Sequence, residues 1–150
     1  MLASQYEQRM KEKNFFLLHN EIFELQLNEY EFKIYAYLIR IEDRRTYQCI
    51  VSYSAIAEAV GFAVNTVAKY VRTLEERGLI RTEHTEFITK DGRKRNGCLR
   101  YHILPFRQAL DCHRERQLAE LEFATARQRA KAKAEKLGIG FIPAGDGQSA

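Results

Sequence analysis

The chain has 150 residues, of which 45% are apolar and 29% are charged, a composition that suits one compact domain. Its three cysteines, Cys49, Cys98 and Cys112, form no CxxC pair, so the sequence encodes neither a disulfide framework nor a four-cysteine zinc site. The longest stretch without a charged residue, 46–57, is shorter than the roughly 18 apolar residues that span a bilayer, and the first residues lack the apolar core of a signal peptide. We therefore expect a cytoplasmic protein without a membrane partner.

Basic charge is concentrated in one part of the sequence. Residues 1–92 carry 12 Lys and Arg against 14 Asp and Glu, a formal charge of −2, whereas residues 93–136 carry 12 against 5, a formal charge of +7. Segregated positive charge is typical of a protein that binds a polyanion, and it also occurs on solvated basic helices. The charge pattern thus indicates nucleic acid as a partner, with a solvated face as the alternative.

The N-terminal part predicts a core helix behind a polar segment. Residues 1–14 are mostly polar, and we expect them to be flexible. Asn28 can cap a helix, and Glu31 stands at the third position of a capping box. Apolar residues then recur at helical spacing on two faces as far as Ile41, which predicts a helix buried in the core.

Two short helices separated by a glycine follow. After a short predicted strand at 47–51, Ser52 or Ser54 can cap a helix that ends at Gly61. A second helix at 65–77 carries an apolar stripe and ends at a glycine. The stripe consists of Val67, Val71 and Leu74. Two helices joined by about three residues, with glycine at the end of the first, are typical of a helix-turn-helix.

Two predicted strands come next. Residues 81–89 are rich in threonine and β-branched residues, and residues 98–104 alternate apolar and polar side chains. The turn signals Asp91-Gly92 and Asn96-Gly97 bracket three consecutive basic residues. These are Arg93, Lys94 and Arg95. We therefore expect a β-hairpin with a basic tip.

The C-terminal part predicts a long helix and a tail. Pro105 can occupy the first turn of a helix that runs to about Lys136 and is rich in Ala, Arg, Glu and Gln. Residues 137–150 contain four glycines without a period, so we expect a disordered tail. The predicted organisation is a flexible segment at 1–14, a domain at 15–104, a basic C-terminal helix at 105–136 and a tail at 137–150.

The segment SYSAIAEAVGFAVNTVAKYVRTLEERGLI, residues 52–80, resembles helix-turn-helix families with a capped short helix, a glycine, a second helix containing TV and the ending LE-x-x-GLI. The upstream stretch FFLLHNEIFELQLNEYEFKIYAYL resembles the N-terminal domain of plasmid replication-initiator proteins and the helix-turn-helix proteins of mobile elements in Gram-positive bacteria. The resemblance covers residues 15–104. It implies a mainly α fold with a small β-hairpin wing, a winged helix-turn-helix, which the long C-terminal helix follows.

This resemblance implies sequence-specific binding of double-stranded DNA by a transcriptional or replication regulator of a mobile element. We expect neither enzymatic activity nor a cofactor. The alternative is a winged helix that serves as a protein-interaction module in a replication or conjugation assembly. Two residues and the near-neutral charge of residues 1–92 favour this alternative. Ala63 and Val64 stand where the family usually has a Ser, which caps the second helix and touches phosphate, and then a basic or polar residue.

Candidate DNA contacts lie on the second helix and on the hairpin. If that helix enters a major groove, its N-terminal exposed residues meet base edges, which makes Asn65, Thr66 and Lys69 candidates for base readout. Side chains further along the helix and on the hairpin are candidates for phosphate or groove contact. These are Arg72, Thr73, Lys90, Arg93, Lys94 and Arg95. The alternative for each is a solvated polar face or a loop that carries charge for solubility.

The last helix has an incomplete apolar stripe that includes Leu118 and Leu121, so it can pack on its own domain or form a homodimer. Catalytic motifs are absent from the sequence, which has neither GxSxG nor a Walker loop. Cys98 and His102 are four residues apart on a predicted strand and could begin a metal site, but no further ligands accompany them. A small buried thiol beside a surface histidine is the simpler interpretation.

Overall fold

The structure is a computed structural model that describes residues 2–138. It divides into two compact units, Met1–Leu110 and Asp111–Ala150. The first element is helix α1 (Leu2–Lys11), whose side chains from Ser4 onward are exposed. The sequence predicts a flexible segment at 1–14, and in the structure residues 2–11 of this segment form a regular helix. The reason is composition, because the polar residues of this stretch, Gln, Glu, Arg and Lys, are also good helix formers.

Helix α2 (Glu29–Ile41) follows the short 3-10 helix η1 (Asn20–Leu25). The predicted cap is confirmed, since the backbone N–H of Glu31 donates to Oδ1 of Asn28 at 2.8 Å. The buried Glu31 carboxylate was expected to complete a capping box, but it lies 2.6 Å from Nε of Arg77. Arg77 also donates through Nη1 to the backbone carbonyl of Leu25 at 3.0 Å. Arg77 thereby ties η1 and the start of α2 together.

Helices α3 (Tyr53–Val60) and α4 (Val64–Glu76) complete the helical layer. Ser52, rather than Ser54, caps α3, because its Oγ accepts the backbone N–H of Ala55 at 3.0 Å. Gly61 ends α3 with φ +79° and Gly78 follows α4 with φ +78°. This left-handed backbone disfavours residues with a side chain, so both helices end at the predicted glycines.

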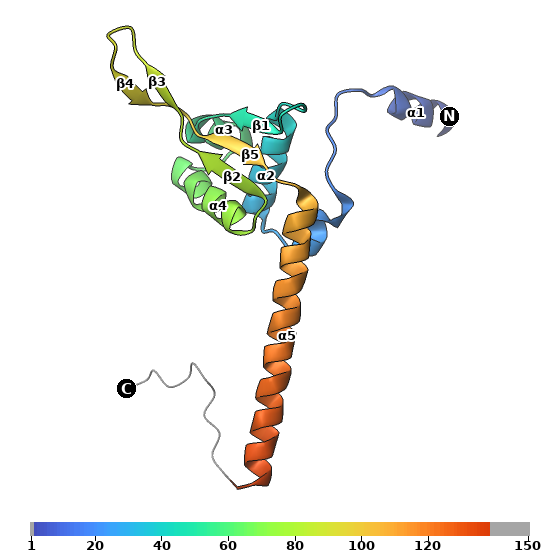
Figure 1. Cartoon of the computed structure of the whole chain (residues 1–150). Helices are drawn as coiled ribbons and strands as arrows, with labels where there is room; N and C mark the ends of the chain where they lie inside the picture. The colour runs from blue at the N-terminus through green and yellow to red at the C-terminus, as the bar shows by residue number, and fades with distance from the viewer. Residues whose placement is uncertain (1, 139–150) are drawn as a thin grey trace. The chain divides into compact units, whose positions relative to one another are not determined.

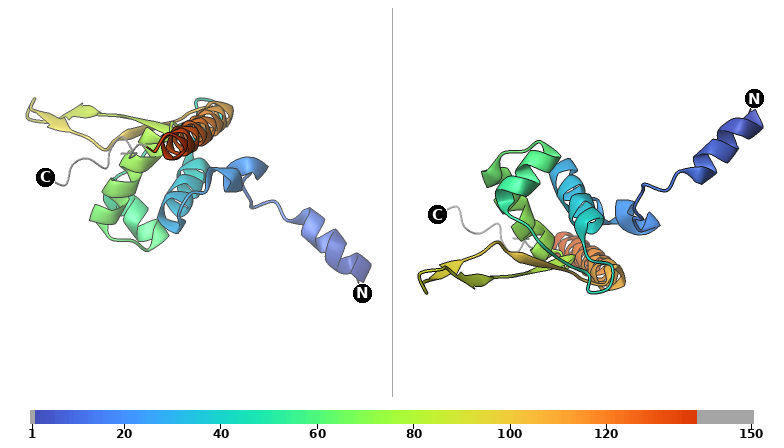
Figure 2. Two further views of the ribbon diagram at one scale, coloured as in Figure 1. Left: turned by 90° about the horizontal axis from the view of Figure 1, so that it is seen from below. Right: turned by 90° about the horizontal axis from the view of Figure 1, so that it is seen from above.

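Three strands form an antiparallel sheet in the order β1 (Gln48–Ile50), β5 (Arg100–Ile103), β2 (Ile80–Glu83). Tyr101 on the central strand pairs with Cys49 on β1 and with Thr82 on β2. Helices α2, α3 and α4 lie on one face of this sheet (Figure 2). A separate two-stranded ribbon, β3 (Glu86–Ile88) and β4 (Lys94–Asn96), extends from the β2 and β5 side (Figure 1).

The hydrophobic core of the first unit joins the helices to the sheet. Its most deeply buried side chains come from each of these elements and from the start of the last helix. They include Ile34, Leu38, Ile56, Val67, Val71, Leu74, Leu79, Ile80, Tyr101 and Leu110. Fully burying one such aliphatic side chain contributes about 1.5–3 kcal/mol. The predicted stripe on α4 is confirmed as part of this core, which fixes the rotation of that helix about its axis.

Helix α5 (Phe106–Lys136) has the predicted bounds. Phe106, Ala109 and Leu110 are buried in the first unit, and the ring of His19 stacks on Phe106 at 4.4 Å. From Asp111 onward almost all described residues of α5 are exposed, including Leu118 and Leu121. The predicted tail lies outside the described residues from 139 onward.

The architecture is therefore mainly α with a small β-hairpin wing, formed by β3 and β4, and a long C-terminal helix. This is the winged helix-turn-helix fold that the sequence predicts. None of the helices within residues 2–138 combines the length and the apolar character needed to cross a bilayer.

Candidate nucleic-acid interface

Helix α4 is positioned by the turn that precedes it and by its buried face. Gly61 and Phe62 both donate their backbone N–H to the carbonyl of Ala57, at 2.8 and 3.1 Å. The chain then reverses and α4 begins after Ala63. Because Val67, Val71 and Leu74 are at most 1% exposed, the opposite side of α4 is held toward solvent.

The exposed side of α4 carries the predicted base-readout residues. Asn65 and Lys69 are exposed and Thr66 is half-buried, all within the first two turns. Arg72 is exposed one turn beyond Lys69. The structure thus brings the predicted polar side chains to one accessible edge of the helix, in the arrangement that major-groove contact requires.

An aromatic cluster supports this edge from α2. The Tyr70 ring stacks on the Tyr30 ring at 4.9 Å with an interplanar angle of 9°. Nζ of Lys69 lies 5.2 Å from the centroid of the Tyr70 ring, which is a cation–π distance. Tyr70 is therefore half-buried against α2, and its ring offers a cation–π partner to the Lys69 ammonium.

Thr73 is a weaker phosphate candidate than the sequence indicates. Its hydroxyl donates to the backbone carbonyl of Tyr70 at 2.9 Å. A phosphate oxygen needs a donor, and the single hydroxyl proton of Thr73 is already used. Arg72 has no such commitment within the described hydrogen bonds and keeps its guanidinium at the surface.

The start of α4 lacks a side-chain cap. Ala63 occupies the N-cap position with extended backbone and makes no side-chain hydrogen bond. Val64, the first residue of the helix, is 44% exposed. The expected departure from the family pattern therefore leaves an accessible apolar surface at the end of α4 where base contacts are expected.

The wing differs from the predicted hairpin in the position of its tip. The turn runs from Thr89 to Arg93, where the N–H of Thr89 donates to the carbonyl of Arg93 at 2.9 Å and Gly92 has φ +76°. Lys90 and Arg93 thus flank the tip, whereas Lys94 and Arg95 lie on β4. The turn signal Asp91-Gly92 determines this tip, and residues 94–96 pair with Glu86–Ile88. All four basic residues are exposed.

Register on β4 separates the basic side chains. Successive residues of a strand point to opposite faces, so Lys94 and Arg95 address different sides of the ribbon. The three consecutive basic side chains at 93–95 therefore do not all lie on one face of the ribbon. This separation depends on the strand bounds, which the sequence pattern does not specify.

The base of the wing is held by close backbone contacts. The strand predicted over 81–89 is interrupted between β2 and β3, where the Thr85 hydroxyl donates to the carbonyl of Cys98. The N–H of Gly97 donates to the carbonyl of Thr85 at 2.7 Å, and a Cβ on Gly97 would collide with Oγ1 of Thr85. Glycine at 97 is thus required by close packing at the wing base.

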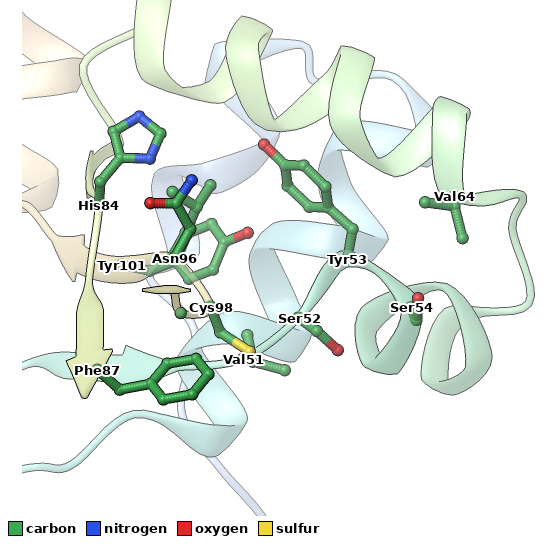
Figure 3. A pocket seen from close by; sticks show the side chains of 12 residues that line it. Val51, Ser52, Tyr53, Ser54, Val64, His84, Phe87, Asn96, Cys98 and Tyr101 are labelled. Carbon is green, nitrogen blue, oxygen red and sulfur yellow. The ribbon is translucent and has the colours of Figure 1, made fainter. Parts of the chain in front are cut away.

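A groove of about 700 Å³ lies between the wing and the first turns of α3 and α4 (Figure 3). Val64 lines one end and Phe87 of β3 the other, and Tyr53 and Asn96 stand between them. Tyr101 at its floor is fully buried with no hydrogen-bond partner for its hydroxyl in the described structure. Burial raises the pKa of Tyr101, which keeps the phenol neutral. No local sequence pattern indicates this groove, since its lining comes from four separate segments.

The candidate metal pair is not brought together as a site. His102 on β5 has its Nε2 2.8 Å from Oε2 of Glu83, whereas Cys98 precedes that strand and is exposed. The expectation of a buried thiol at 98 is therefore wrong, because the residue lies in the connection between β4 and β5. Cys49 is the buried thiol, and burial raises its pKa to about 11. Within residues 2–138 no three potential ligands are grouped as a metal site would need.

Comparison with known proteins agrees with this geometry. Residues 25–80 match the family described as "Helix-turn-helix domain", a range that runs from the end of η1 to the start of β2. No curated protein matches the chain. The matched range contains α2, α3 and α4, so the similarity coincides with the helices of the helix-turn-helix in the structure.

Among solved structures, a "possible transcriptional regulator" from Methanosarcina mazei Go1 is similar with a TM-score of 0.50 and 12% identity, covering 79% of this chain and 98% of that one. The zinc-responsive MarR family member ZitR of Lactococcus lactis has a TM-score of 0.40 and 18% identity, with 89% and 85% covered. MepR of S. aureus, in complex with DNA, has a TM-score of 0.37 and 14% identity, with 92% of this chain and 94% of that one covered. At 12% identity, the similarity to the Methanosarcina mazei protein concerns the fold alone.

Proposed function

We propose that this chain binds double-stranded DNA through α4 and the wing and acts as a regulator of transcription. One observation carries the proposal. Helix α4 of a helix-turn-helix domain holds three apolar side chains in the core and turns Asn65, Lys69 and Arg72 toward solvent. A helix fixed in this way presents the same edge to every ligand, as readout of a base sequence requires.

The two parts of the interface have different tasks in this proposal. Asn65 and Lys69 can pair with adenine and guanine edges and supply sequence preference. The wing cations and Arg72 neutralise phosphates and supply affinity that depends on salt but little on sequence. The mechanism is equilibrium binding and involves neither a catalytic step nor a cofactor.

The finer role we propose is control of transcription or replication of a mobile element. Its support is the sequence resemblance of the stretch FFLLHNEIFELQLNEYEFKIYAYL to plasmid initiator domains and mobile-element proteins. In the structure this stretch forms η1 and most of α2, the elements that Glu31 and Arg77 connect to α4. Helix-turn-helix repressors, activators and initiators share such a scaffold, so the role follows from the DNA site that the chain selects.

We further propose that α5 joins two copies of the chain. Leu118, Leu121 and Phe123 are each more than half exposed on this helix, and helices in water are stabilised mainly by packing of an apolar face. Light scattering tests the idea with Leu118→Asp combined with Leu121→Asp. The variant should have half the mass of the parent and the same melting temperature for the first unit. A parent that is already a monomer contradicts the dimer.

The experiment that tests DNA binding is selection of bound fragments from genomic DNA by the purified full chain at moderate salt. Recovery of one shared motif supports a sequence-specific regulator. Recovery of no motif, with binding that does not exceed background, favours the protein-interaction module, for which the apolar Ala63 and Val64 at the start of α4 are the specific observation.

A further inference from the structure

We propose that Val64 recognises thymine in the DNA site, by contact with the 5-methyl group in the major groove. The inference rests on the proposed DNA-binding function and deepens it. Val64 is the first residue of α4, is 44% exposed and directly precedes Asn65. A residue at this place on a recognition helix is presented to base edges together with the polar residues beside it.

The chemistry of the groove selects thymine. In the major groove, adenine, guanine and cytosine offer hydrogen-bond donors and acceptors, and thymine adds an apolar methyl group to its acceptor. An apolar side chain placed over a donor or acceptor removes water from it without replacing the hydrogen bond, which is unfavourable. Against a methyl group the same side chain buries apolar surface on both partners, which is favourable. Val64 therefore fits thymine better than any other base.

The surroundings of Val64 leave this contact open. Ala63, which precedes it, is small and exposed, and no side chain caps the helix start. Val64 also lines one end of the 700 Å³ groove, whose other end is formed by Phe87 of the wing, 51% exposed (Figure 3). Both walls thus belong to elements of the proposed interface. Continuity with that interface identifies the occupant at the Val64 end as DNA.

Methyl deletion in the DNA tests the contact directly. The probe is the selected duplex, in which each thymine is replaced in turn by deoxyuridine, so that only the 5-methyl group is removed. We expect the affinity of the parent chain to fall about fourfold at one thymine of the site, which corresponds to removal of one buried methyl. Val64→Ala should bind the thymine and uracil duplexes equally at that position.

Matched variants separate Val64 from its neighbours. Asn65→Ala and Phe87→Ala should keep the fourfold preference for thymine at that position, because each leaves Val64 in place. Val64→Thr keeps the shape and one methyl, so it should retain part of the preference. The melting temperature of each variant is measured beside the parent, and because Val64 is partly exposed we expect all of them to fold.

Three results overturn the proposal. In the first, the parent binds all thymine and uracil duplexes equally. In the second, the selected site contains no thymine. In the third, Val64→Ala retains the preference for thymine over uracil, or only Phe87→Ala removes it. In each of these cases the chain still binds its duplex, so the proposed function stands. A chain that selects no duplex overturns both together.

Discussion

Helix α4 and the wing both offer cations to a polyanion, but the fold holds them in different ways. Helix α4 has three side chains that are at most 1% exposed, whereas all six residues of β3 and β4 are exposed. The helix is therefore anchored through its own side chains. Among the described residues, the hydrogen bonds that hold the wing to the rest of the domain lie at its base, where Thr85 contacts Gly97 and Cys98.

This difference in anchoring indicates that α4 and the wing have different roles in the proposed interface. A readout residue must be held at a defined angle to a base edge, and the buried stripe of α4 provides that constraint. Phosphates are charged, numerous and regularly spaced along DNA, so a cation on a ribbon without a core can reach one in several arrangements. We expect sequence preference to depend on α4 and salt dependence to depend on the wing.

The largest expected effect comes from breaking the anchor of α4. Leu74→Ala should lower the free energy of unfolding by about 2–5 kcal/mol, because it leaves a cavity under the helix. Ile88→Ala on β3, where the side chain is 70% exposed, is the matched control and should change it by less than about 0.5 kcal/mol. Urea unfolding followed by circular dichroism gives both values. Equal losses would mean that the wing is packed as tightly as α4.

The next effect concerns base readout. Asn65→Ala and Lys69→Ala should each reduce the ratio of specific to non-specific DNA affinity, because each removes a base contact. The reduction should correspond to about 1–3 kcal/mol of binding free energy. Titrations of the selected site and of random DNA at one salt concentration measure the ratio. Arg72→Ala is the control, and it should weaken both affinities alike. Unchanged ratios for Asn65→Ala and Lys69→Ala would remove these two side chains from readout.

A smaller effect is expected when the wing is stripped of its charge. Replacing Arg93, Lys94 and Arg95 together with Ala should reduce the slope of log affinity against log salt by about 0.9 for each phosphate that the wing no longer neutralises. Since Lys94 and Arg95 point to opposite faces, we expect the triple replacement to free fewer than three phosphates. Fluorescence titrations over a salt series give the slope.

The control for the wing variant is a triple replacement of Lys131, Lys133 and Lys136 on α5 with Ala, which removes the same net charge. This control should leave the slope unchanged. If the α5 variant lowers the slope as much as the wing variant does, total charge and not the wing determines the salt dependence.

The smallest effect lies at the sheet below the wing. The hydrogen bond from His102 lowers the pKa of Glu83, and the charge of Arg100 adds to it. A carboxyl whose folded pKa lies below its unfolded value contributes stability above the unfolded pKa, near 4.5, and this contribution is lost as the pH falls through the folded pKa. Glu83→Gln should therefore melt slightly below the parent at pH 7.

That difference should disappear at a pH low enough to protonate Glu83 in both states, well below 4.5. Glu86→Gln on β3, where the side chain is exposed, removes the same charge from the wing and should melt with the parent at pH 7. Melting curves at both pH values check the prediction. A Glu83→Gln variant that melts with the parent at every pH would show that the interaction adds no stability.

Much of the helical part of the fold could be predicted from local signals. Asn28 and Ser52 are caps because their side-chain oxygens accept an N–H three residues further on, and Gly61 and Gly78 end helices through their own backbone preference. These interactions lie within a few residues, so they are visible in the sequence. The helix at 2–11 is not predicted, because a mostly polar composition does not distinguish an exposed helix from a flexible segment.

The 3.6-residue period of Val67, Val71 and Leu74 is visible in the sequence, and it specifies which residues of α4 face inward and therefore which polar residues face out. Tertiary structure alone decided the groove between Val64 and Phe87, the ion pair of Glu31 with Arg77, and the stacking of Tyr70 on Tyr30. The physical reason is separation along the chain. Such contacts join segments 20 or more residues apart, and their geometry depends on how the helices pack on the sheet, which no local pattern specifies.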